Sequence, residues 1–208
     1  MTKATKEIGD KILRFLNPVH EAKKASAIIQ EKINYLSNRR ECKGEEESGE
    51  GIRKKVREEI EGLGRLCEKQ LKRLIDREFE RKAIIEDKCK SFTVMVSLVG
   101  VISSLMLGMG RVHFTLAVLL VMAFIYVTIG FFALLTVLFN ENIVYEVPDD
   151  RQDDLNELQI ACLANRYKNM IRTNYLSAFY SSIKRFFVLL MIFFVVYYAF
   201  YYSQSRTN

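Results

Sequence analysis

The sequence predicts an all-α fold: an integral membrane protein with three transmembrane helices and a cytoplasmic helical bundle or stalk. Three stretches lack Lys, Arg, Asp and Glu, and each approaches the roughly 20 residues that a helix needs to cross the hydrocarbon core of a bilayer. The 31 Lys and Arg and the 25 Asp and Glu of this 208-residue chain crowd into the remaining segments. The predicted spans are Ser91 to Gly108, Phe114 to Phe139 and Phe186 to Tyr202.

The N-terminal charged segment, residues 1–90, is expected to form a cytoplasmic helical arm. Apolar residues at 8–16 have helical spacing, and Asn17 followed by Pro18 marks the end of that helix and the start of a new one. The second helix should run to Ser37, before a solvated acidic and glycine-bearing loop at 43–51. Its apolar face comprises Val19, Ala22, Ile29, Ile33 and Leu36.

A third apolar pattern begins at Ile52, recurs every three or four positions, and meets no proline before the first span. One long helix is therefore expected to continue from the cytoplasm into the bilayer as a stalk, with a weak point at Gly62 and Gly64. The stalk could form an oligomeric coiled coil or pack against the helix at 18–37. We favour the pairing within one chain, because Arg77 and Arg81 interrupt a sustained heptad.

The second half of the chain predicts a hairpin and another helix that enters the membrane. Gly108 and Gly110 favour a tight turn that joins the first two spans. Residues 140–185 are expected to be a cytoplasmic helical segment, extended at 141–148 and helical after Asp149 and Asp150. Its helix should feed the third span and leave 203–208 as a short external tail. Its apolar face comprises Leu155, Leu158, Cys162, Leu163, Tyr167, Met170 and Ile171.

Basic residues flank the predicted spans mainly on one side, and Lys and Arg resist translocation. The link between the first two spans holds only Arg111 and His113, and the tail only Arg206. The N-terminus is therefore expected in the cytoplasm and the C-terminus outside. The basic residues that precede the first and third spans are Arg77, Arg81, Lys82, Lys88, Lys90, Arg166, Lys168, Arg172, Lys184 and Arg185.

No catalytic or metal-binding pattern stands out, so we expect a protein that is not an enzyme and has no cofactor. His20 and His113 have no nucleophile near them in sequence. The acidic residues at 149–157 lack the spacing of a known cation-binding loop and are interpreted as a helix start. The four cysteines, at 42, 67, 89 and 162, lie far apart and predict reduced thiols.

Two residue sets are candidates for function. Polar but uncharged residues inside the first two spans suit either close helix packing or the lining of a narrow path through an oligomer. No ionisable residue lies inside a predicted span, which argues against secondary active transport. The candidates are Ser97, Gly100, Ser103, Ser104, Thr128, Gly130 and Thr136.

The net charge of +6 predicts partners for the basic residues. Anionic lipid headgroups are the first expectation, and an anionic ligand such as a nucleotide is the alternative. Nucleic acid is not expected, because no stacking aromatics interleave with these charges. The candidate residues are Arg53, Lys54, Lys55, Arg57, Lys184 and Arg185.

The charged helix that leads into the hairpin carries a resemblance to a known family. The segment Arg77-Glu-Phe-Glu-Arg-Lys-Ala-Ile-Ile-Glu-Asp-Lys-Cys-Lys-Ser-Phe92, followed by two spans, resembles the SLATT and Pycsar-type transmembrane effectors of bacterial antiphage nucleotide-signalling systems. The likeness is architectural and covers about residues 75–140; the third span and the lack of a recognisable nucleotide-binding domain depart from it. The resemblance implies location in a bacterial inner membrane, homo-oligomerisation on an infection signal, for which a nucleotide second messenger is one candidate, and membrane disruption.

Two functions remain open on the sequence. In the first, the protein is a regulated pore-forming or membrane-perturbing effector, whose cytoplasmic helices sense a signal and whose spans open an ion path. In the second, it is a membrane-anchored scaffold, whose cytoplasmic helices recruit a cytosolic protein.

Overall fold

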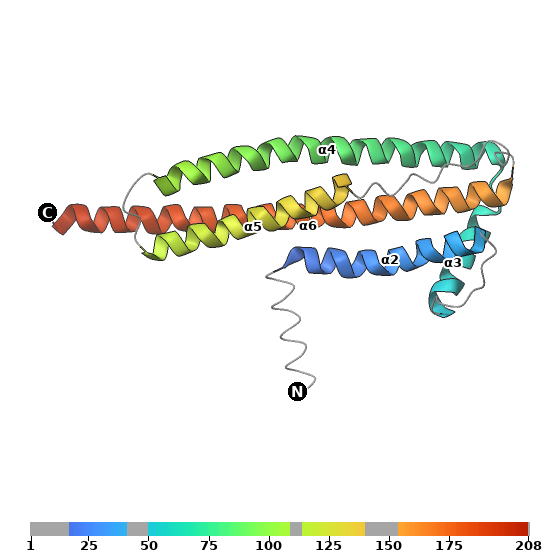
Figure 1. The fold of residues 1–208 in the computed structure, drawn as a ribbon, viewed down its shortest axis with the longest axis horizontal. Coiled ribbons are helices and arrows are strands. Elements are labelled where there is room, and N and C mark those ends of the chain that lie inside the picture. The colour runs from blue at the N-terminus through green and yellow to red at the C-terminus, as the bar shows by residue number, and fades with distance from the viewer. Residues whose placement is uncertain (1–16, 41–49, 109–113, 140–153, 208) are drawn as a thin grey trace, which may run out of the picture. The chain divides into compact units, whose positions relative to one another are not determined.

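The computed structural model describes residues 17–40, 50–108, 114–139 and 154–207, and every element in these ranges is an α-helix. The order is α2 (Pro18–Arg40), α3 (Glu50–Leu63), α4 (Glu68–Gly108), α5 (Phe114–Phe139) and α6 (Leu155–Thr207), as Figure 1 shows. The predicted all-α class is thus confirmed for the described residues. Several expected features lie outside them: the helix at 8–16, most of the loop at 43–51, the turn at 108–110, the extended piece at 141–148 and the helix start at Asp149 and Asp150.

The chain forms two compact units. Within the described residues, the charged unit consists of 22–40, 50–88, 138–139 and 154–174, and the apolar unit consists of 89–108, 114–137 and 175–207 with 17–21. Helices α4 and α6 contribute residues to both units, whereas α3 belongs to the charged unit and nearly all of α5 to the apolar unit.

Helix α2 begins where the sequence predicts. The Asn17 side-chain oxygen accepts hydrogen bonds from the backbone N–H groups of Val19 (3.1 Å) and His20 (3.3 Å), which makes Asn17 the N-cap. Pro18 then occupies the first helical position, where its missing N–H costs nothing. The predicted inner face is confirmed at its most buried positions, Ala22, Ile29 and Leu36.

The predicted single stalk helix from Ile52 is wrong, because the structure divides it into α3 and α4. Helix α3 ends at Leu63, and the Gly64 N–H closes its last turn by donating to the Ile60 carbonyl at 2.9 Å. A new cap follows: the Cys67 N–H donates to the Gln70 side-chain oxygen at 3.1 Å, and the Gln70 N–H donates back to the Cys67 carbonyl at 2.9 Å. The Gln70 side chain thus caps the first turn of a new helix, so the chain starts a second helix here instead of bending the first.

The second expected long helix is confirmed as continuous. Helix α6 runs for 53 residues without a break, from Leu155 in the charged segment through the third apolar stretch to Thr207. Asp154 caps it, because its carboxylate accepts the Asn156 N–H at 2.9 Å and its carbonyl accepts the Leu158 N–H at 3.0 Å.

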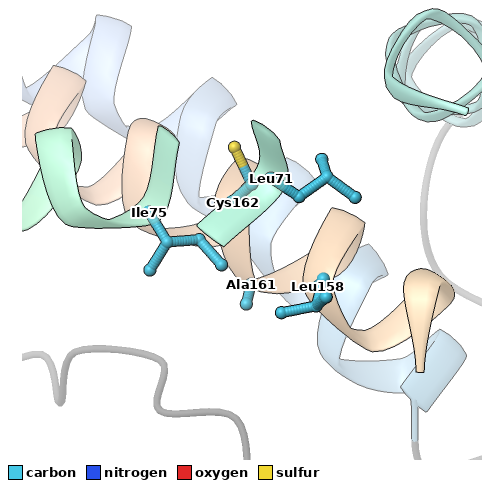
Figure 2. Close-up of a cluster of buried hydrophobic side chains, with 5 residues drawn as sticks. All are labelled: Leu71, Ile75, Leu158, Ala161 and Cys162. Atoms are coloured by element: carbon cyan, nitrogen blue, oxygen red, sulfur yellow. The ribbon is translucent and has the colours of Figure 1, made fainter. Parts of the chain in front are cut away.

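In the charged unit, α4 and α6 pack through a small apolar core. Leu71 and Ile75 from α4 meet Leu158, Ala161 and Cys162 from α6, and all five are buried (Figure 2). The spacing of four within each helix puts these residues on one face, which explains why the apolar periodicity of both segments was readable in the sequence.

In the apolar unit, α5 runs antiparallel to the C-terminal part of α6. Leu116 and Leu120 near the start of α5 pack on Phe193, whereas Gly130, farther along α5, lies against Phe179 and Ser182. The residue numbers thus fall along α6 as they rise along α5. This direction agrees with the two helices drawn side by side in Figure 1.

Two described helices, not the three predicted, are long and apolar enough to cross a membrane: α5 over Leu116–Phe139, and α6. This finding rests on length and composition. The stretch predicted as the first span, 91–108, is helical as the C-terminal part of α4 but is not among the two.

Candidate functional site

A buried polar network joins α4 to α6 in the charged unit. The Asn169 amide donates to the Glu78 carboxylate at 2.8 Å and to the Glu78 carbonyl at 2.7 Å, and its own oxygen accepts from the Arg172 guanidinium at 3.0 Å. Asn169 and Arg172 are 1% and 5% exposed. Buried polar groups of this kind hold two helices in one register, because any shift leaves them unpaired.

A small cavity adjoins this network. It measures about 10 Å³, which is roughly the space for one water molecule. The buried Nε of Arg172 has no hydrogen-bond partner, so a water at this position would satisfy it. The lining residues are Glu78, Phe79, Lys82, Asn165, Asn169 and Arg172.

The cations around the cavity affect one another. Burial lowers the pKa of Arg172, against the opposing charge of Glu86. Burial also lowers the pKa of Lys168, and the positive charges of Arg172 and Lys82 lower it further. The charged unit therefore concentrates positive charge at the α4–α6 contact, with Glu78 and Glu86 as the compensating acids.

A second polar junction ties three helices together. Glu59 of α3 accepts a hydrogen bond from the Tyr167 hydroxyl of α6 at 2.8 Å and forms an ion pair with Lys32 of α2, also at 2.8 Å. The Lys32 ammonium lies 4.8 Å from the centre of the Tyr167 ring, which adds a cation–π contact. Burial, the Glu59 hydrogen bond and the Glu59 charge raise the pKa of Tyr167.

The basic residues chosen on α3 do not gather around the cavity, which α4 and α6 line. Lys54, Lys55 and Arg57 are exposed and Arg53 is half-buried. Arg57 donates from Nε to the Tyr35 hydroxyl of α2 at 3.3 Å. This set is therefore an exposed basic surface on α3, with Arg57 also holding α2.

The polar residues chosen for the spans separate into two kinds. Ser97, Thr128 and Thr136 each donate their hydroxyl to the carbonyl four residues earlier, at 2.9–3.0 Å, so their polarity is satisfied within their own helices. Ser97 and Thr128 are exposed. Ser103 and Ser104 lie in α4, but their side chains are outside the description.

The two glycines of that set also differ. A Cβ atom at Gly130 would lie 3.3 Å from both Phe179 Cδ2 and Ser182 Cβ, so Gly130 allows α5 to approach α6 closely. A Cβ atom at Gly100 would meet nothing within 4 Å. The close contact at Gly130 thus involves Phe179 and Ser182, which the sequence analysis did not select.

An arginine contacts the middle of α5. The guanidinium carbon of Arg185 lies 5.7 Å from the centre of the Tyr126 ring, and Tyr126 is at the midpoint of the 26-residue α5. The sequence placed Lys184 and Arg185 before a span that starts at Phe186. The contact with Tyr126 instead places Arg185 beside the middle of the second predicted span. The second and third predicted spans therefore do not lie side by side along their full lengths.

Sequence reasoning missed Tyr126 and its contact with Arg185. The only signal for Tyr126 was an aromatic hydroxyl inside an apolar run.

Compared with protein-family models, curated proteins and solved structures, the chain matches none of them.

Proposed function

We propose that the protein is a regulated, pore-forming membrane effector, in which the charged unit responds to a signal and the apolar units of several copies open an ion path. The observation that carries this proposal is the Arg185–Tyr126 contact at the midpoint of α5. A cation beside the middle of an uncharged 24-residue apolar stretch is a marker of function, because ionisable groups at such depth are rare and usually line paths or sites.

The surface of the apolar unit supports insertion into a bilayer. Large apolar side chains are exposed along both helices, far beyond the scattered ones normal for a soluble surface. Lipid tails would cover them without leaving backbone groups unpaired, since both helices satisfy their own. These residues include Val118, Val121, Met122, Phe124, Ile125 and Phe132 on α5 and Ile192 and Phe194 on α6.

The energetics favour an oligomer. Inserting a Lys or Arg at the centre of a membrane helix costs about 2.5–3.5 kcal/mol on insertion scales. Placing both Lys184 and Arg185 in hydrocarbon would cost about twice that free energy, unless water or protein surrounds the two side chains. Copies of this chain packed around a water-filled path would provide such surroundings, and a homo-oligomer is therefore part of the proposal.

Regulation is assigned to the charged unit. Helices α4 and α6 pass unbroken from charged-unit residues to apolar-unit residues, so a change at the Asn169 network would act on elements that continue into the spans. The basic surface of α3, where Lys54 and Lys55 are exposed and Arg53 is half-buried, suits an anionic signal such as a nucleotide, or lipid headgroups. Together with the family resemblance, this surface supports a role in antiphage defence at a bacterial inner membrane. The proposed orientation has the N-terminus in the cytoplasm and the C-terminus outside, with 91–108 as a further span.

The test is ion leakage through membranes that contain the full chain. Vesicles with the wild-type protein should lose an imposed membrane potential, and Arg185→Leu should reduce that loss at least tenfold. Arg73→Leu, which removes an exposed arginine of the charged unit, is the matched control and should leak like wild type. A wild-type protein that leaves the potential intact at high density, with and without added nucleotides, contradicts the proposal.

The alternative function is a membrane-anchored scaffold, and exposed apolar residues on the charged unit favour it. Ile28 and Ile84 are 53% and 55% exposed and offer contacts to a cytosolic protein. Replacing both with Glu should abolish co-purification of a partner while membrane insertion remains normal. A scaffold would show this loss with no leak in the parent protein, whereas an effector would leak in both forms.

A further inference from the structure

We infer that the proposed path selects small inorganic anions such as chloride, and that Lys184 is the residue that sets this preference. The inference rests on the proposed function and adds the class of permeating ion to it. Its basis is the position of Lys184 next to Arg185, the exposure of its side chain, and the charge content of the membrane segments.

The register of α5 on α6 fixes the level of Lys184. Arg185 contacts Tyr126, which lies about 15 Å along α5 from Leu116 and about 20 Å from Phe139 at 1.5 Å per residue. Lys184 precedes Arg185 by one residue and therefore shares this level to within one helical rise. From the middle of such a stretch, the four-carbon stem of a lysine is too short to bring its ammonium to either membrane surface.

Lys184 and its neighbour have different surroundings. Arg185 is half-buried against the Tyr126 ring, whereas Lys184 is exposed on the outside of α6. Ser177 and Ser181, two turns and one turn earlier, fall on the same side of the helix as Lys184 and are exposed or half-buried. This side of α6 thus carries an exposed cation and two hydroxyls, followed by the exposed apolar residues Val188 and Met191, whereas the side chains exposed on α5 near the level of Lys184, Phe124 and Ile125, are apolar.

A lysine at this level of a membrane helix almost always faces the interior of a bundle or a water-filled cavity, because placing its charge in hydrocarbon is costly. Lys184 therefore marks the side of α6 that faces the path, and Phe124 and Ile125 mark a side that faces lipid. In an oligomer, one Lys184 from each copy forms a ring of positive charge at the middle of the membrane. Rings of Lys or Arg attract anions and repel cations.

The composition of the two membrane segments agrees with this preference. Cys89–Val137 and Tyr175–Asn208 contain no Asp and no Glu. A cation path normally exposes carboxylates or a ring of carbonyls, and these helices use their carbonyls internally. The charged side chains in the two segments are all basic: Lys90, Arg111, Lys184, Arg185 and Arg206.

The experiment measures ion preference in planar bilayers of uncharged phosphatidylcholine that contain the full-length protein. Under a potassium chloride gradient, the current should reverse near the chloride equilibrium potential, with chloride permeability several-fold above potassium permeability. Lys184→Gln should weaken this ratio and Lys184→Glu should invert it. Lys69→Glu, the same charge change at an exposed position of the charged unit, should leave the ratio unchanged.

A second measurement keeps the test valid if Lys184→Glu does not insert. Lys184→Cys, in a chain with Cys42 and Cys67 replaced by Ser, should react with membrane-impermeant thiosulfonates, because the side chain at this position faces the path. Ile125→Cys lies at the same level on the lipid-facing side and should stay unreactive, because a thiol in lipid does not ionise.

The outcomes separate the two proposals. A conductance that prefers potassium, or one that Lys184→Glu leaves unchanged, overturns the anion inference and leaves the pore intact. Equal reactivity of the Ile125→Cys and Lys184→Cys variants also overturns it, because both sides would then face water. A protein that conducts no ion overturns the pore and the anion inference together.

Discussion

Asn169 and Glu78, 91 residues apart in sequence, form a two-point contact in which one amide group reaches both the side chain and the backbone of its partner. Replacing Asn169 with Ala removes both hydrogen bonds and the acceptor for Arg172. Asn169 and Arg172 are buried while Glu78 is half-buried, so the loss falls mainly on Arg172, and we expect a decrease of about 1–3 kcal/mol in the free energy of unfolding. Thermal unfolding of the full chain in detergent measures it.

The matched control for this prediction is Asn38→Ala. Asn38 is exposed on α2, so its loss should change the unfolding free energy by less than about 0.5 kcal/mol. Equal effects of the two substitutions would mean that the α4–α6 contact in the charged unit does not depend on Asn169.

The two span glycines provide a second, internally controlled prediction. Gly130→Leu would push α5 away from Phe179 and Ser182, and we expect it to destabilise the apolar unit by about 1–3 kcal/mol. Gly100→Leu meets open space and should be tolerated. The melting temperature of each variant in one detergent decides the matter, and a larger loss at Gly100 would show that the α5–α6 contact is misplaced.

Tyr167 gives a prediction for pH. Its pKa is raised in the folded chain, first by burial and then by Glu59, above the value of about 10 that it has when unfolded. The hydroxyl therefore contributes its full stability below about pH 10, and the contribution falls as the pH rises further, because only the unfolded chain releases the proton. At pH 7, Tyr167→Phe should cost about 1–2 kcal/mol.

The penalty of Tyr167→Phe should shrink between about pH 10 and pH 11. Comparing the wild-type protein with the variant by chemical unfolding at each pH removes the contributions of other titrating groups, which both proteins share. A penalty that stays constant from neutral pH through this range would contradict the Tyr167–Glu59 hydrogen bond.

Much of the fold could be predicted from local signals in the sequence. Asn17 and Pro18 define the start of α2 because capping depends on adjacent residues. The division between α3 and α4 was missed for a related reason: the glycines suggested a bend, but the helix start depends on a Cys67–Gln70 cap that resembles an ordinary helical spacing.

Contacts between distant segments were less accessible. Hydropathy identifies an apolar run but not its alignment with another helix, so nothing in the sequence placed Arg185 beside Tyr126. The polar residues of the spans show the same limit, since Gly130 and Gly100 look alike in sequence and differ only in what packs on them. Asn169 likewise lay between residues of a predicted apolar face and gave no sign of its partner on α4.

Thiol reactivity provides the final prediction. Cys162 is buried in the α4–α6 core, and burial, with the nearby Glu78 charge, raises its pKa, whereas Cys67 is exposed at the start of α4. Since the thiolate is the reactive form, an uncharged maleimide should label Cys67 within minutes and leave Cys162 unlabelled in the folded chain. Mass spectrometry of proteolytic fragments locates the label.

Leu71→Ala, which opens the core around Cys162, should increase the labelling rate of Cys162 at least tenfold while Cys67 reacts as before. Rapid labelling of Cys162 in the wild-type protein would show that α4 and α6 do not pack as described.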